Sequence, residues 1–141
     1  MQESAPSSQL VQRAEEIARH AHRGQFRRDG VTPYIVHPEA VAVRVKGDAL
    51  AEATAWLHDT LEDTSLTVEQ LRAHDIPEQV IAAVALLTKQ ENSDYEQYLV
   101  RLKANPLAKK VKIADLLANL SDHPSDRQIV KYAKGLLVLL G

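Results

Sequence analysis

Residues 49–64 read ALAEATAWLHDTLEDT, and this stretch does most to decide the fold. Its first part, Ala49–Leu57, is a run of apolar and small residues that suits a buried helix, and the preceding Asp48 is a good helix cap. Helical spacing of apolar residues recurs along the chain, whereas only 4% of residues are aromatic and β-branched residues rarely alternate with polar ones. The sequence therefore predicts an all-α protein, a single bundle of about eight helices.

The other expected helices follow from caps and prolines. Ser7 or Ser8 caps a first helix that runs to about His22, and Pro38 opens a second that runs to about Val45. The third carries His58 and Asp59, and a short fourth is expected after a capping box at residues 67–70. Four more are expected at about residues 77–88, 95–104, 106–120 and 126 to near the end. We expect one domain over residues 7–141, with residues 1–6 disordered.

Composition narrows the class of partner. The chain has 141 residues and a net charge of −2, so it has no overall attraction for nucleic acid or an anionic membrane, and we expect neither as a partner. It has no cysteine, and its N-terminus lacks the apolar segment of a signal peptide, so a cytoplasmic location is expected. The longest apolar run, Leu136–Leu140, is too short to span a bilayer and belongs to the core or to a contact between identical subunits in a homo-oligomer.

The second part of the quoted stretch carries the chemistry. On a continuous helix His58 and Asp59 lie about 100° apart, with Glu62 one turn beyond His58 and Asp63 one turn beyond Asp59. Such a row of acidic groups is costly to bury unless its charge is compensated. A divalent metal ion would compensate it, and the alternative is a polar helix end that faces solvent.

Two other segments supply ligand-type residues. His37 stands just before Pro38, which is expected to hold its backbone extended, and Asp115 interrupts an apolar helix with Asn119 one turn further on. Asp115 would otherwise be a buried carboxylate paired with Lys112. Imidazoles and carboxylates together suit Mn²⁺, Fe²⁺ or Zn²⁺ better than Mg²⁺ or Ca²⁺, and such an ion makes water a nucleophile near neutral pH. The candidate metal ligands are His37, His58, Asp59 and Asp115.

Together these segments resemble a known family. The chain is similar to the hydrolase domain of the RelA/SpoT family, within the HD superfamily of metal-dependent phosphohydrolases, and most resembles its stand-alone small alarmone hydrolases. The resemblance covers about residues 10–132. It is carried by the blocks AHRGQ (21–25), RRDG (27–30), PYIVHP (33–38), LHDTLEDT (57–64) and KIAD (112–115) with Asn119.

The resemblance implies a Mn²⁺-dependent enzyme that removes the 3′-pyrophosphate from guanosine tetra- or pentaphosphate, the alarmone of the stringent response. It implies metal binding by the four candidate ligands and an acid/base pair of Glu62 and Asp63. Residues near the substrate's phosphates, base or nucleoside would be Arg27, Arg28, Asn119 and Tyr132. Water would attack the phosphorus nearest the ribose 3′-oxygen or its bond partner, and which bond breaks stays open.

Some features depart from the family pattern. The family's synthetase region is absent, so alarmone synthesis is not expected. Position 28, often lysine, is Arg28, and Ser121 stands where many relatives carry arginine. These changes leave two alternatives open: a broader nucleotide phosphatase, for instance one that acts on NADPH, and a regulatory module that binds a nucleotide without cleaving it.

Overall fold

The computed structural model describes residues 6–141, and over that range the chain folds into nine α-helices without a β-strand. The expected all-α class is confirmed. Residues 1–5, most of the segment expected to be disordered, lie outside the described part. No helix of the described chain is long and apolar enough to cross a membrane. The helices are α1 (Pro6–Ala21), α2 (Val36–Arg44), α3 (Ala49–Leu57), α4 (Thr60–Asp63), α5 (Val68–Ala73), α6 (Glu78–Leu87), α7 (Tyr95–Lys103), α8 (Pro106–Leu120) and α9 (Asp126–Leu140).

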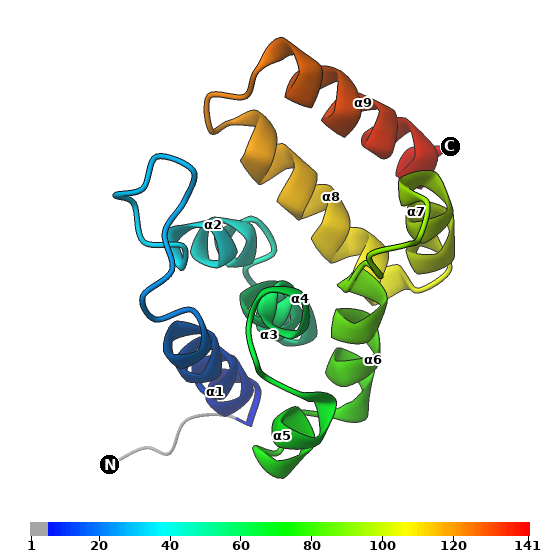
Figure 1. The fold of residues 1–141 in the computed structure, drawn as a ribbon. Helices are drawn as coiled ribbons and strands as arrows, with labels where there is room; N and C mark the ends of the chain where they lie inside the picture. Colours follow the sequence, from blue (N-terminus) through cyan, green and yellow to red (C-terminus); the bar gives the residue numbers. More distant parts are fainter. Residues whose placement is uncertain (1–5) are drawn as a thin grey trace.

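Helix α3 lies at the centre of the bundle and contacts α1, α2, α6 and α8 (Figure 1). It is the apolar run Ala49–Leu57, and six of its nine residues are buried, including Trp56. Helix α9 packs along α8 and against α7 (Figure 1). A helix that is apolar on most sides has to be surrounded by others, so this stretch organises the bundle around itself.

The caps of α3 and α5 are found where the sequence predicted them, whereas Ser7 and Ser8, expected to cap the first helix, lie inside α1, which begins at Pro6. Asp48 accepts a hydrogen bond from the backbone N–H of Ala51 at 3.1 Å and caps α3. Thr67 and Gln70 form both bonds of a capping box at α5, and Ser125 begins a second capping box at α9. These bonds satisfy N–H groups that have no partner inside the helix, and they depend only on neighbouring residues.

The segment around His58 differs from the expected continuous helix. Helix α3 ends at Leu57, α4 begins at Thr60, and the two residues between them form a turn. His58 Nδ1 bonds to the carbonyl oxygen of Ala55 at 2.6 Å, and Thr60 Oγ1 donates to that of Leu57 at 2.7 Å. Side chains thus occupy carbonyls near the end of α3, as is typical of residues that compete with the helical bonding pattern. The break accounts for a ninth helix.

The backbone at His37 also differs from the expectation. Helix α2 begins at Val36, two residues before Pro38, so His37 lies in the first helical turn and is not extended. A proline in the first turn lacks only an N–H that would have no partner there, so the helix tolerates it. The backbone N–H of His37 donates to the carbonyl of Tyr34 at 3.0 Å, which fixes where the imidazole leaves the helix.

Candidate metal centre and pocket

Three buried side chains from separate elements meet beside α3. They are His37 of α2, His58 of the turn after α3, and Asp115 of α8, and their ligand atoms all lie within 4.8 Å of one another. Asp115 Oδ1 is 2.7 Å from His37 Nε2 and 3.5 Å from His58 Nε2. Residues 78 positions apart in sequence therefore share one small buried site.

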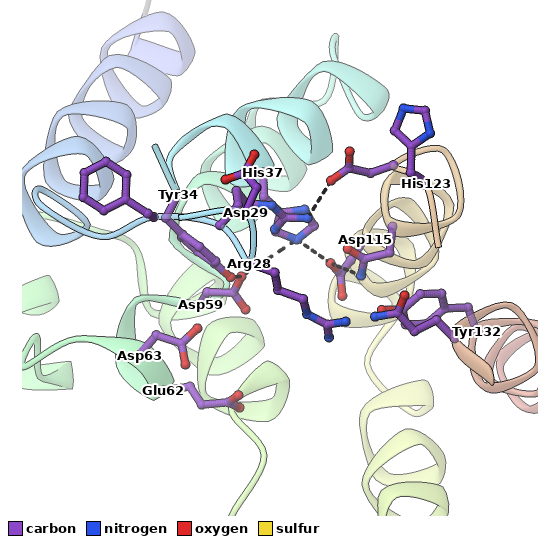
Figure 2. Close-up of a pocket in the computed structure, with 15 residues that line it drawn as sticks. Arg28, Asp29, Tyr34, His37, Asp59, Glu62, Asp63, Asp115, His123 and Tyr132 are labelled. Atoms are coloured by element: carbon purple, nitrogen blue, oxygen red, sulfur yellow. Dashed lines mark hydrogen bonds and ion pairs between the residues drawn. The ribbon is translucent and has the colours of Figure 1, made fainter. Parts of the chain in front are cut away.

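Asp59 lies at the edge of this group. Its Oδ2 is 3.1 Å from His58 Nε2 and 3.9 Å from His37 Nε2, and its side chain remains 19% exposed. Tyr34 donates its phenolic O–H to the same Oδ2 at 2.5 Å (Figure 2). The structure thus brings together all four residues expected as metal ligands, and Asp59, the most exposed of them, lines the pocket together with His37 and Asp115.

The hydrogen bonds of His58 test whether a cation fits. A carbonyl oxygen can only accept, so the bond to Ala55 O identifies Nδ1 as the protonated nitrogen of the neutral ring. This leaves a lone pair on Nε2, which is fully buried and receives no hydrogen bond. In the neutral ring this lone pair faces the carboxylates of Asp59 and Asp115, at 3.1 Å and 3.5 Å, so three electron-rich groups converge on one point. A divalent cation is the partner that such a set accommodates.

The close approach of these histidines and carboxylates also shifts the pKa values of His58 and Asp115. Burial lowers the pKa of His58, but the carboxylates of Asp59 and Asp115 outweigh it and raise the pKa well above its ordinary value. Without a cation, Nε2 therefore carries a proton at neutral pH, and a metal ion bound there would displace that proton. Burial raises the pKa of Asp115, but Lys112 and the two histidines outweigh it and hold the pKa well below its ordinary value. Asp115 is therefore ionised and available as an anionic ligand at neutral pH.

Lys112 and Asn119 orient Asp115 from the same helix. Lys112 Nζ lies 2.9 Å from Asp115 Oδ2, and its side chain is only 13% exposed. Asn119 Nδ2 lies 3.4 Å from Asp115 Oδ1, one turn further along α8. Because Lys112 holds Oδ2, Oδ1 is the oxygen turned toward the two histidines. Asp115 can therefore pair with Lys112 through one carboxylate oxygen and still offer the other oxygen to a metal ion.

Glu62 and Asp63, expected as the acid/base pair, project from α4 into the pocket below Asp59 (Figure 2). Glu62 Oε1 accepts the backbone N–H of Lys89 at 2.7 Å, which fixes the carboxyl group from the loop after α6. Burial raises the pKa of Glu62, and burial together with Asp59 raises the pKa of Asp63. Each carboxyl therefore stays protonated to a higher pH than an ordinary one, as a proton donor requires.

The residues expected to bind substrate line the same pocket, a hollow of about 550 Å³ that opens in front of Asp59. Arg28 extends across it toward the Tyr132 side (Figure 2). Arg27 forms an ion pair with Asp122 of the α8–α9 turn at 2.9 Å and lies over the ring of Tyr34. The expected substrate residues found in this lining are Arg27, Arg28, Asn119 and Tyr132.

Two residues of the site had no role assigned from sequence. Tyr34 holds Asp59, and Gln25 links His22 Nδ1, at 2.8 Å, to the backbone carbonyl of Asp63, also at 2.8 Å. Gln25 lies in the block AHRGQ and Tyr34 in the block PYIVHP. A tyrosine three residues before a candidate ligand was the available signal, but its partner is 25 positions away and depends on the fold.

No family model matches the chain, but individual proteins do. Mouse guanosine-3′,5′-bis(diphosphate) 3′-pyrophosphohydrolase MESH1 is 35% identical over 127 residues, which cover 82% of this chain and 70% of the mouse protein. A guanosine-3′,5′-bis(diphosphate) 3′-pyrophosphohydrolase from Aquifex aeolicus is 32% identical over 78% of this chain, and a probable GTP pyrophosphokinase from Mycobacterium leprae is 32% identical over 92%. The matches span only 17% and 18% of those two longer relatives.

A solved structure shares the fold. It belongs to a protein described as "A metazoan ortholog of SpoT hydrolyzes ppGpp and plays a role in starvation responses". The two structures superpose with a TM-score of 0.81 over 100% of this chain and 89% of the other, at 23% sequence identity. The helical arrangement around α3 is therefore that of a known fold.

Proposed function

The chain belongs to the family of RelA/SpoT-type HD hydrolases that includes the mouse 3′-pyrophosphohydrolase, and from this premise we propose that it removes the 3′-pyrophosphate from guanosine tetra- or pentaphosphate. The metal site, the acid/base pair and the phosphate-binding arginines are parts of this proposal. The cytoplasmic location and the homo-oligomer expected from the sequence stay predictions.

The observation that carries the proposal is the buried Nε2 of His58. It has a lone pair and no hydrogen-bond partner, and two carboxylates face it. A site arranged in this way is costly to the folded protein unless a proton or a metal ion lies between these groups. A divalent cation bound there would supply Lewis-acid activation of water and neutralise phosphoryl oxygens. The proposed ligands are His37, His58, Asp59 and Asp115.

We assign the ion as Mn²⁺, with Fe²⁺ or Zn²⁺ as competitors. Two imidazole nitrogens with two carboxylates form a mixed set, which favours these ions over Mg²⁺ and Ca²⁺. The lysine that holds Asp115 from behind, at 2.9 Å, keeps one carboxylate oxygen from turning away from the site. Isothermal titration with each ion in turn tests the assignment, and Mn²⁺ should bind at least as tightly as Mg²⁺.

The acid/base roles follow from position and proton affinity. Glu62 is held by the backbone N–H of Lys89, and its raised pKa favours the protonated form that donates to a leaving oxygen. Asp63 stands beside it in α4, with its main-chain carbonyl fixed by Gln25. Arg27 and Arg28 carry guanidinium groups that suit phosphate oxygens. In this scheme Asn119 and Tyr132 contact the nucleoside.

A turnover assay over a panel of substrates tests the proposal. The protein is incubated with Mn²⁺ and guanosine tetraphosphate, guanosine pentaphosphate or NADPH, and each product is identified. We expect inorganic pyrophosphate from the first two. Asp115→Ala and His58→Ala should lose both bound metal and turnover, whereas Lys109→Ala, an exchange on the same α8 away from the cluster, should keep both.

Other outcomes of the same assay identify the alternatives. Orthophosphate released from NADPH, without pyrophosphate from the guanosine nucleotides, would indicate the broader phosphatase. Tight nucleotide binding without any product would indicate the regulatory module. Full activity of a metal-stripped sample would contradict the metal-dependent proposal altogether.

A further inference from the structure

A second hollow reaches the candidate metal centre from the side of α7. It encloses about 630 Å³ and is bordered by the loop after α6, by α7, and by the facing parts of α8 and α9. The pocket of Figure 2 reaches the same centre from the loop at residues 26–29. The two hollows therefore meet at the candidate centre, where they share Asp59, Glu62, Asn119 and Tyr132.

The two hollows differ in charge. The described residues that line the pocket of Figure 2 include two arginines but six carboxylates, and one of these arginines, Arg27, is already paired with Asp122. The second hollow has the opposite balance, with two carboxylates, Asp59 and Glu62, against three lysines. We call it the lysine hollow, after Lys89, Lys112 and Lys131.

Two of these lysines have no carboxylate partner within residues 6–141. Lys112 is committed to Asp115, but neither Lys89 nor Lys131 takes part in an ion pair of the described chain. Lys89 Nζ donates to the carbonyl of Gln90 at 3.2 Å, and Lys131 Nζ lies 4.8 Å from the centroid of the Tyr95 ring. Their ammonium groups retain donors for an anion that enters beside the metal ligands.

We propose that the lysine hollow binds the pyrophosphate that hydrolysis releases, with Lys89 and Lys131 as its counter-charges. This inference rests on the proposed function. Water adds its oxygen to the phosphorus joined to the ribose 3′-oxygen, the bond between that phosphorus and the 3′-oxygen breaks, and the 3′-oxygen takes a proton. The departing group is a polyanion, so it moves to the lysine hollow, where two unpaired ammonium groups face two carboxylates, and away from the pocket of Figure 2, where six carboxylates outnumber the arginines.

The type of residue supports a product site. Lysine ammonium groups act as point charges on flexible stems, without the two-pronged geometry that lets arginine hold a phosphate in one orientation. Lys131 is exposed and Lys89 is half-buried, so water screens both. Such groups attract pyrophosphate away from the centre without retaining it.

The test uses inorganic pyrophosphate as the probe and does not require turnover. Pyrophosphate is titrated calorimetrically into the full chain in the presence of saturating Mn²⁺, with Lys131→Glu as the variant and Lys134→Glu as the matched control. Lys134 lies on α9 three residues further on and does not line the lysine hollow. We expect binding to weaken by about tenfold or more in Lys131→Glu, as for a lost hydrogen bond to a charged group. In Lys134→Glu the affinity for pyrophosphate should change by less than about threefold, because the substituted charge lies outside the hollow and water and salt screen its effect.

Equal weakening in the two variants, or no binding to the unmodified chain, would overturn the inference. Thermal unfolding of both variants verifies that each is folded. This test is independent of the proposed function. If the chain binds pyrophosphate through Lys131 but hydrolyses no nucleotide, the inference about the lysine hollow holds and the proposed reaction is wrong. If the chain hydrolyses the nucleotide but Lys131→Glu binds pyrophosphate as well as the unmodified chain, the proposed reaction holds and the inference about the lysine hollow is wrong.

Discussion

At the scale of single residues, the candidate centre depends on which lone pairs the buried side chains leave free. His58 commits Nδ1 to the carbonyl of Ala55, so Nε2 faces inward. Lys112 commits Asp115 Oδ2, so Oδ1 faces the histidines. Tyr34 donates to Asp59 and limits its rotation. These bonds orient three of the four ligand-type residues before any ion arrives, which lowers the cost of binding one.

Replacement of Glu62 separates chemistry from metal binding. Glu62→Gln keeps the size of the side chain and an oxygen that accepts the N–H of Lys89, but it removes the ionisable proton. We expect unchanged Mn²⁺ affinity by calorimetry and a fall in kcat of about 10²- to 10⁴-fold, the usual contribution of general acid–base catalysis. Glu69→Gln, an exposed change on α5, is the control. Turnover of Glu62→Gln close to that of the unmodified chain would remove Glu62 from the mechanism.

The chemical types of the residues predicted which side chains form the site, but the sequence did not predict the contacts that hold them in place. Histidines and aspartates in an apolar setting are recognisable in the sequence, and the four expected ligands do lie together. The support for Glu62 comes from a backbone N–H of Lys89, and every residue except proline has such a group. The sequence holds no signal for that contact, because it exists only once the loop after α6 packs beside α4.

At the scale of elements, the break between α3 and α4 matters most. Periodicity predicted one helix through Asp59, but side-chain bonds to the carbonyls of Ala55 and Leu57 end α3 early. Periodicity reports which face is apolar and does not detect a side chain that competes for backbone carbonyls. The starts of α3 and α5 were predicted correctly, because each capping bond joins residues only three positions apart in the sequence.

The cap of α3 yields a stability prediction with a defined pH dependence. A hydrogen bond from Lys110, and then the N–H of Ala51, lower the pKa of Asp48. A lowered folded-state pKa means that the stabilisation is present above the ordinary value of 3.8 and is lost as the pH falls through the folded-state value. Asp48→Ala should therefore reduce the free energy of unfolding by about 1 kcal/mol at pH 7, and by less near pH 3.

Urea unfolding at several pH values measures this difference. Asp48→Asn is the matched control, because asparagine keeps the cap and loses only the ion pair with Lys110, which is half-exposed and worth little. A deficit in Asp48→Ala that stays constant down to the acid limit would show that the charge of Asp48 contributes nothing.

At the scale of the whole molecule, an ion pair joins two distant parts of the pocket wall. Arg27 in the loop between α1 and α2 and Asp122 in the turn between α8 and α9 are 95 positions apart, and their charged atoms lie 2.9 Å apart. The sequence predicted that Arg27 faces substrate but not that a carboxylate already occupies it. An anionic substrate must compete with Asp122 for this guanidinium.

Removal of that competitor should improve substrate binding. Asp122→Asn leaves a neutral side chain of the same size, so Arg27 is free for phosphate and the negative charge of the pocket falls. Exposed ion pairs are worth about 0.2–1 kcal/mol, so we expect KM to fall by up to about fivefold with kcat nearly unchanged. Asp126→Asn, on the neighbouring first turn of α9, is the control. A rise in KM in Asp122→Asn would mean that Asp122 itself helps to hold the substrate.

The most direct measurement of the central claim is to locate a bound ion in crystals grown with Mn²⁺, from the anomalous scattering of manganese. We predict one strong peak within bonding distance of His37 Nε2, His58 Nε2, Asp115 Oδ1 and a carboxylate oxygen of Asp59, and no such peak in Asp115→Ala. A peak elsewhere on the molecule, or none at saturating Mn²⁺, would contradict the account.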